Sequence, residues 1–178
     1  MKNLFAMAAA TLLLASCSKK VSELPAATDS GENTFGASVN GTLWAPRKSV
    51  MPSAPPVEAS FAGGDDYVIH ARDLGSTPRE TEFEIFLKDI TRPGTYVLNA
   101  NTAKMPNHSG AYAYYVERNM TPKYEYITSS TNTGSVNITR VDKANHILAG
   151  TFSFTAKEIN GKTDPINVTE GRFDVQIQ

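Results

Sequence analysis

One face of an expected strand carries residues that could exchange protons. Asp66, His70 and Arg72 are spaced by four and two residues, and such spacing places side chains on the same face of a strand. A carboxylate beside an imidazole can orient the ring for general acid–base catalysis. The alternative interpretation is an ordinary polar strand facing solvent. Asp66 and His70 are therefore the candidate catalytic pair if the protein is a hydrolase, for which the export signal described below would imply envelope polymers as the substrate.

The other two histidines do not form a metal-binding pattern. His108 and His146 lie in or beside expected loops, and neither has a second His or a Cys at metal-ligand spacing. Zinc sites usually need three or four N, S or carboxylate ligands. Asp65 and Asp66 could offer oxygens to calcium, but the stretch lacks the length and spacing of an EF-hand loop. The sequence predicts no metal site and no cofactor.

No local motif identifies a catalytic nucleophile. The patterns G-x-S-x-G and H-E-x-x-H, which mark serine hydrolases and zinc peptidases, do not occur in the 178 residues. A triad scattered through the chain would leave no such pattern. The sequence therefore favours a non-enzymatic binding or interaction module, with the hydrolase and a purely structural envelope component as alternatives.

Aromatic residues suggest a binding surface. Tyr112 and Tyr114 share one face of an expected strand, and Tyr124 and Tyr126 share one face of the next. If the two strands pair, these tyrosines could align across the ladder. Exposed, they would form a platform for sugar rings or a patch for a protein partner, whereas buried they would belong to the core. Trp44, which follows an expected turn, is a further candidate ligand-binding residue.

The elements that must position these residues are strands. Asn40-Gly41 is typical of a type I′ hairpin turn between the stretches 34–39 and 42–44. The longest expected strands are 135–141 and 147–157, and the terminal strand has a possible bulge at Gly171. No convincing 3.6-residue period appears. The sequence predicts an all-β fold, a single antiparallel β-sandwich or barrel-like domain of about nine or ten strands.

The N-terminus has the composition of an export signal. In residues 1–16, Lys2 precedes an apolar run from Leu4 to Leu14 that only Thr11 interrupts. Signal peptides have apolar segments of about 7–15 residues, whereas a membrane-spanning helix needs about 20. Residues 1–16 are therefore predicted to be a signal peptide that is cleaved.

Leu14-Ala15-Ser16-Cys17 resembles the bacterial lipobox. The resemblance implies cleavage before Cys17 and lipidation of that cysteine. Two membrane signals suffice for stable anchoring, so the several acyl chains of a lipoprotein would hold the protein permanently. Ser18, rather than Asp, implies sorting to the outer membrane by analogy with other lipoproteins. The periplasmic face is favoured over the cell surface.

The remaining chain divides into a tether and one domain. Residues 17–32 are predicted to be the lipidated cysteine and a flexible tether, because they are small and polar without a hydrophobic period. Residues 33–178 are predicted to form the β-rich domain. The net charge of −1 argues against a nucleic-acid partner. The expected partners are the membrane, through Cys17, and a glycan or an envelope protein.

Three stretches resemble an uncharacterised family of Bacteroidetes lipoproteins. They are the NTFGASVNG opening at 33–41 with Trp44, the GTFSF strand at 150–154 and the TEGRFDV ending at 169–175. In that family, such stretches frame a small β-rich domain. The resemblance implies a lipoprotein with a β fold, and it brings no activity, cofactor or catalytic residue.

Overall fold

The computed structural model describes residues 21–49, 54–75, 78–105 and 109–178. In these ranges the protein consists of strands and loops, so the all-β prediction is confirmed. Eleven strands are present rather than nine or ten, and they include two short edge strands, β2 and β6. The strands are β1 (Thr34–Val39), β2 (Thr42–Trp44), β3 (Val57–Gly63), β4 (Asp66–Asp73), β5 (Thr81–Leu87), β6 (Gly94–Leu98), β7 (Tyr112–Asn119), β8 (Thr121–Ile127), β9 (Gly134–Asp142), β10 (Ile147–Glu158) and β11 (Ile166–Gln176).

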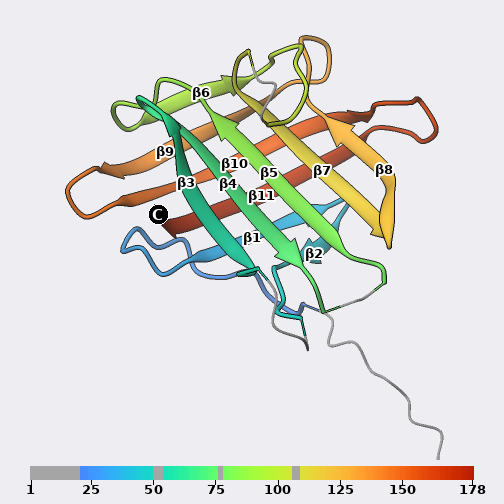
Figure 1. Ribbon diagram of the computed structural model, residues 1–178, viewed down its shortest axis with the longest axis horizontal. Helices are drawn as coiled ribbons and strands as arrows, with labels where there is room; N and C mark the ends of the chain where they lie inside the picture. Colours follow the sequence, from blue (N-terminus) through green and yellow to red (C-terminus); the bar gives the residue numbers. More distant parts are fainter. Residues whose placement is uncertain (1–20, 50–53, 76–77, 106–108) are drawn as a thin grey trace, which may run out of the picture.

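The strands form two layers. We refer to β8-β7-β5-β4-β3 as the front sheet and to β2-β1-β11-β10-β9-β6 as the back sheet, in order of pairing. All these neighbours are antiparallel. Strands of the front sheet cross those of the back sheet at a wide angle (Figure 1). Such crossed packing needs a strand that passes from one sheet to the other.

Strand β10 is that connection. Most of its length pairs with β9 and β11, but its last residues, Lys157 and Glu158, pair with β8 of the front sheet. At the opposite side, Ala59 of β3 forms a bridge with Ile177, and the Gln178 amide donates to the Ala59 carbonyl over 2.9 Å. The two sheets therefore touch at both sides, and the fold combines features of the sandwich and the barrel between which the sequence did not decide.

The core lies between the sheets and is rich in aromatic rings. In β10, Phe152 and Phe154 are buried while Thr151 and Ser153 are exposed, as expected for a strand with one face on a core. The Phe152 ring lies 5.2 Å from that of Phe35. Burial of apolar area at about 25 cal/mol per Å² is the main stabilising contribution of such packing.

A bulge interrupts β11. Between the pairs Phe152–Gly171 and Phe154–Val168, β11 has one residue more than β10, and Glu170 has a positive φ of 54°. A Cβ atom at Gly171 would lie 2.4 Å from two ring carbons of Phe152. The predicted bulge at Gly171 is therefore confirmed, and the core ring occupies the space that a side chain there would need.

The segment 24–32, which we call the N-terminal arm, lies on the outer face of the back sheet. The buried carboxylate of Asp174 accepts hydrogen bonds from the amides of Ser30 (2.9 Å), Gly31 (2.6 Å) and Glu32 (3.3 Å). Gly31 has a φ of +82°, which lets three successive amides point at one anion. Burial raises the pKa of Asp174, but hydrogen bonds from the arm outweigh it and lower that pKa.

The arm differs from the flexible tether expected over residues 17–32. Arg140 donates to the Asp29 carbonyl over 2.7 Å, and Arg172 donates to the Pro25 carbonyl over 3.3 Å. Pro25 also packs on Gly36, where a Cβ atom would lie 2.6 Å from the proline ring. The arm is therefore held by hydrogen bonds between its backbone and the back sheet, although its sequence has no hydrophobic period.

Several predictions concern residues outside the described ranges. Residues 1–16, with the predicted signal peptide, Cys17 and His108 lie there. Among the residues that the structure describes, no helix has both the length and the apolar content to cross a membrane.

Candidate functional site

His70 lies on the outer face of the front sheet, between carboxylates of the neighbouring strand. It pairs in register with Glu84 of β5, and its Nδ1 atom is 3.2 Å from Glu82 Oε1 and 3.8 Å from Glu84 Oε2. Asp66 is not its partner in the described structure, because Asp66 Oδ1 accepts the Asp89 amide over 2.8 Å. The predicted Asp66–His70 pair is not formed, since the nearest carboxylates come from β5.

Glu82 is the centre of an ionic network on this face. Besides His70, it accepts from Arg72 Nε over 3.2 Å and from Arg118 Nη2 over 2.9 Å. Arg72 also pairs with Glu58 over 3.0 Å. Burial by itself raises the pKa of Glu82, but the bonds from His70 and Arg118 and the charge of Arg72 lower it to about 2. Glu82 therefore stays ionised at neutral pH and does not act as a proton donor.

Tyr112 and Tyr114 belong to the same face but are buried, with exposures of 0% and 3%. The Tyr112 hydroxyl donates to Glu84 over 2.5 Å, and the Tyr114 hydroxyl donates to Glu125. Met105, from the loop after β6, covers Tyr112 and donates its amide to Glu84 over 3.0 Å. Burial and the carboxylate partners raise the pKa of both phenols well above the usual range. These tyrosines do not form an exposed platform.

Tyr124 and Tyr126 lie on the opposite side of the front sheet, against the main core. In the register of β7 and β8, Tyr126 faces Tyr115, and Tyr114 faces Ile127. The expected alignment of Tyr112 and Tyr114 with Tyr124 and Tyr126 is therefore not formed. The sequence could not show this, because a shift of one residue exchanges the faces of a strand.

Trp44 and His146 also contact other groups of the protein. Trp44 is 8% exposed, its indole donates to Thr81 Oγ1 over 2.7 Å, and its ring lies 4.7 Å from that of Phe83. The Nδ1 atom of His146 lies 3.3 Å from the Ile177 carbonyl, at the turn after β9. Trp44 is thus a core residue rather than an exposed binding residue.

Asp65 and Asp66, which were considered as calcium ligands, have their carboxylates bonded to other groups of the protein. Asp65 forms an ion pair with Lys143, and Asp66 accepts a hydrogen bond from the Asp89 amide. Within the described ranges, no group of three or more His, Cys, Asp or Glu side chains could hold a metal ion.

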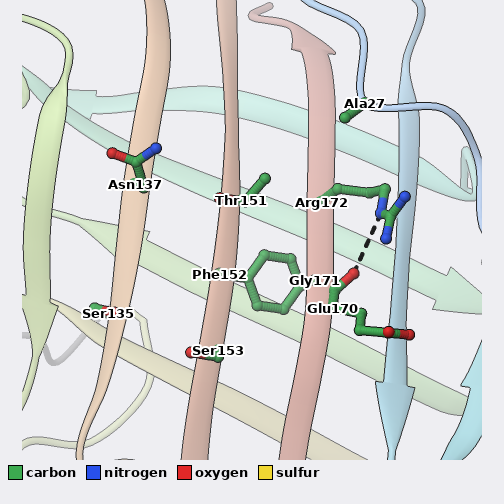
Figure 2. Close-up of a pocket in the computed structure, with 9 residues that line it drawn as sticks. All are labelled: Ala27, Ser135, Asn137, Thr151, Phe152, Ser153, Glu170, Gly171 and Arg172. Carbon is green, nitrogen blue, oxygen red and sulfur yellow. Dashed lines mark hydrogen bonds between the residues drawn. The ribbon is translucent and has the colours of Figure 1, made fainter.

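The outer face of the back sheet is different, since it is hollowed and covered by small polar side chains (Figure 2). We call one depression on this face, of about 430 Å³, the polar groove. The polar groove is lined by Ala27, Ser135, Asn137, Thr151, Phe152, Ser153, Glu170, Gly171 and Arg172. An adjoining hollow of about 420 Å³ shares Ser135 and Ser153 with it and continues over Thr155, Asn167 and Thr169.

The strand register arranges the polar groove in rows. Thr151 of β10 pairs with Asn137 of β9 on one side and with Arg172 of β11 on the other. Two residues further along β10, on the same face, Ser153 pairs with Ser135. Neighbouring strands are about 4.8 Å apart, so each row presents hydroxyl, amide or guanidinium groups at regular intervals across the sheet.

Two features described above produce the depression. Gly171 has no side chain, so the floor between β10 and β11 is formed by the ring of Phe152 and the glycine backbone. The N-terminal arm adds a wall through Ala27. The bulge and the arm together turn a flat sheet surface into a groove.

Arg172 stands at the edge of the polar groove next to the arm (Figure 2). Its Nε donates to the Glu170 carbonyl over 3.2 Å and its Nη1 to the Pro25 carbonyl over 3.3 Å. Both acceptors are uncharged. In the part of the chain that the structure describes, no carboxylate forms an ion pair with Arg172.

The sequence of a single strand indicates part of the groove but not all of it. The alternation of Thr151, Ser153 and Thr155 with buried residues indicates a polar outer face. Only the three-dimensional register brings Asn137 and Arg172 to the two sides of Thr151.

Fold and surface together define a class: an all-β protein of two crossed sheets with an open polar groove on one outer face. The family model described as "Domain of unknown function (DUF6252)" matches residues 32–175, and the chain belongs to this family. No curated protein and no solved structure matched the chain.

Proposed function

We propose that this protein is a lipid-anchored cell-envelope module that binds a glycan in the polar groove without turning it over. The observation that carries the proposal is the groove itself, about 430 Å³ in volume and lined by hydroxyl, amide and guanidinium side chains. An adjoining hollow extends it along β10. An elongated polar surface of this kind suits an oligosaccharide.

A glycan fits the chemistry of the groove. Hydroxyl and amide groups both donate and accept hydrogen bonds, so Ser153, Thr151 and Asn137 can match the hydroxyls of a sugar in several orientations. Phe152 and Gly171 lie at the base of the groove but are buried, so the polar side chains provide most of the surface that a sugar would contact.

The front-sheet network favours binding over hydrolysis. His70 is held by Glu82 and Glu84, and Glu82 is held by two arginines. These side chains are bonded to one another, and none of them lines the polar groove. The hydrolase alternative named Asp66 as the partner of His70, whereas the carboxylate beside His70 is that of Glu82, 3.2 Å away.

The membrane attachment rests on the sequence alone. We propose that Cys17 carries the lipid, that the outer membrane is the location with the periplasmic face favoured, and that the family comprises Bacteroidetes lipoproteins. Mass spectrometry of the membrane-extracted protein tests this. An N-terminal peptide that begins at Cys17 with acyl chains supports the proposal, whereas an unmodified Cys17 contradicts it.

Glycan binding is tested with the full-length chain in detergent. Titration against a panel of envelope oligosaccharides should give a saturable rise in melting temperature, because a ligand that binds only the native state stabilises it. Ser153→Tyr, which fills the groove and its adjoining hollow, should abolish the rise. Thr121→Tyr, at an exposed position of β8 in the front sheet, is the matched control. A response that survives in Ser153→Tyr would place binding elsewhere.

A further inference from the structure

Arg172 places a positive charge at the edge of the polar groove. Four other arginines of the described structure form ion pairs with carboxylates: Arg47 with Asp73, Arg140 with Asp142, and Arg72 and Arg118 with Glu82. Arg79 and Arg92 are exposed and do not line the polar groove. Arg172 is instead held by two carbonyls. Because no carboxylate of the described residues is paired directly with Arg172, its positive charge is available to an anionic ligand.

We infer that the polar groove selects sugars that carry a carboxylate, such as uronic acids, and that Arg172 binds the carboxylate. This inference rests on the proposed glycan-binding function. A planar guanidinium matches a carboxylate with two parallel hydrogen bonds, and such charged bonds are stronger than neutral ones.

Arg172 is prepared for this role by its contacts. The Glu170 and Pro25 carbonyls fix Nε and Nη1, while Nη2 donates to no group in the described chain. A side chain that is already ordered loses less rotamer entropy when a ligand binds. The free end of the guanidinium remains for the carboxylate.

The same row supplies contacts for the rest of the ligand. Thr151 lies between Arg172 and Asn137 in the strand register. The backbones of the two outer residues are about 10 Å apart, and the Arg172 side chain extends from β11 toward β1 (Figure 2). An oligosaccharide of more than one ring can therefore bring a carboxylate to Arg172 while hydroxyls of another ring face Thr151 and Asn137.

Glu170 provides a charge of the opposite sign at the same edge. It lines the groove, is exposed, and forms no ion pair with Arg172 in the described structure. An exposed carboxylate repels an anionic ligand weakly and in a salt-dependent manner. Removing its charge should therefore strengthen acidic-sugar binding, while removing that of Arg172 should weaken it.

The test compares a galacturonic acid trisaccharide with a galactose trisaccharide by calorimetric titration of the full-length protein in detergent. The acidic sugar should bind about tenfold more tightly, as one charged hydrogen-bond pair warrants. Arg172→Gln, which can still bond a carbonyl, should remove this preference, because it weakens binding of the acidic sugar about tenfold more than binding of the galactose trisaccharide. Glu170→Gln should tighten acidic-sugar binding about twofold. Arg79→Gln, an exposed arginine of the front-sheet side, is the matched control.

Each other result has a distinct meaning. Equal affinity for both sugars, or a preference that persists in Arg172→Gln, overturns the inference and leaves the glycan-binding proposal intact. Binding of neither sugar, together with no response to the wider oligosaccharide panel, overturns both. A melting temperature of Arg172→Gln close to that of the unchanged protein shows that a lost preference does not reflect misfolding.

Discussion

The outer faces of the two sheets use polar side chains in opposite ways. On the front sheet, Glu82 and Glu84 are bonded to arginines, His70 and Tyr112. On the back sheet, Thr151 and Ser153 face solvent in a groove and Arg172 has no carboxylate partner in the described chain. Polar groups that are satisfied internally stabilise the fold, whereas polar groups left open can bind a ligand. The richest cluster of ionisable residues is therefore not the best candidate site.

The largest effect is expected on the front sheet. Glu82→Ala leaves Arg72, Arg118 and His70 around a missing carboxylate, and it should lower the free energy of unfolding by about 3 kcal/mol. Urea denaturation measures this. Glu170→Ala, on the groove, is the control and should change stability by less than about 0.5 kcal/mol. Equal effects at the two positions would erase the contrast between the faces.

A smaller effect is expected where the groove meets the core. Gly171→Ala places a Cβ atom against the Phe152 ring, so the ring or the strand must shift, at a cost of about 2 kcal/mol. Thermal unfolding followed by circular dichroism measures the loss. In Gly41→Ala, where the new Cβ meets nothing within 4 Å, only the strain of a φ of +79° remains. A fully stable Gly171→Ala would show that the groove floor is not set by this contact.

The smallest effect is a pH dependence that belongs to the front sheet. The pKa of Glu82 is lowered from its usual 4.5 to about 2 in the folded protein, so its ionised form stabilises the fold above pH 4.5. Protonation removes this contribution as the pH falls from about 4.5 to about 2. Glu82→Gln should be less stable by about 1–2 kcal/mol at neutral pH.

Comparing the unchanged protein with Glu82→Gln separates the contribution of Glu82 from that of other carboxylates. One of these is Asp174, whose pKa is also lowered. In urea denaturation at several pH values, the gap between the unchanged protein and Glu82→Gln should close toward pH 2. A gap that stays constant with pH would mean that the charge of Glu82 does not contribute.

The sequence predicted the strands well because their patterns are local. Asn40-Gly41 marks the first hairpin turn and both residues have a positive φ, and β10 alternates as its residues indicate. The candidate sites were harder to predict from the sequence, because they depend on which strands pair and in which register. Glu84 lies opposite His70 only through the β4–β5 register, and Arg172 joins Asn137 only through β10. The arm was missed because backbone hydrogen bonds to Asp174 leave no hydrophobic pattern.

The order of strands along the chain has a consequence for how the protein acquires its structure. Strand β1 pairs with β11, and the two sheets are joined through β10, so the earliest strand to be synthesised needs partners from the end of the chain. Such long-range contacts slow folding and leave strand edges open meanwhile. A ribosome that stops before residue 147 would release a chain whose back sheet cannot assemble, so truncated copies would be substrates for chaperones and proteases.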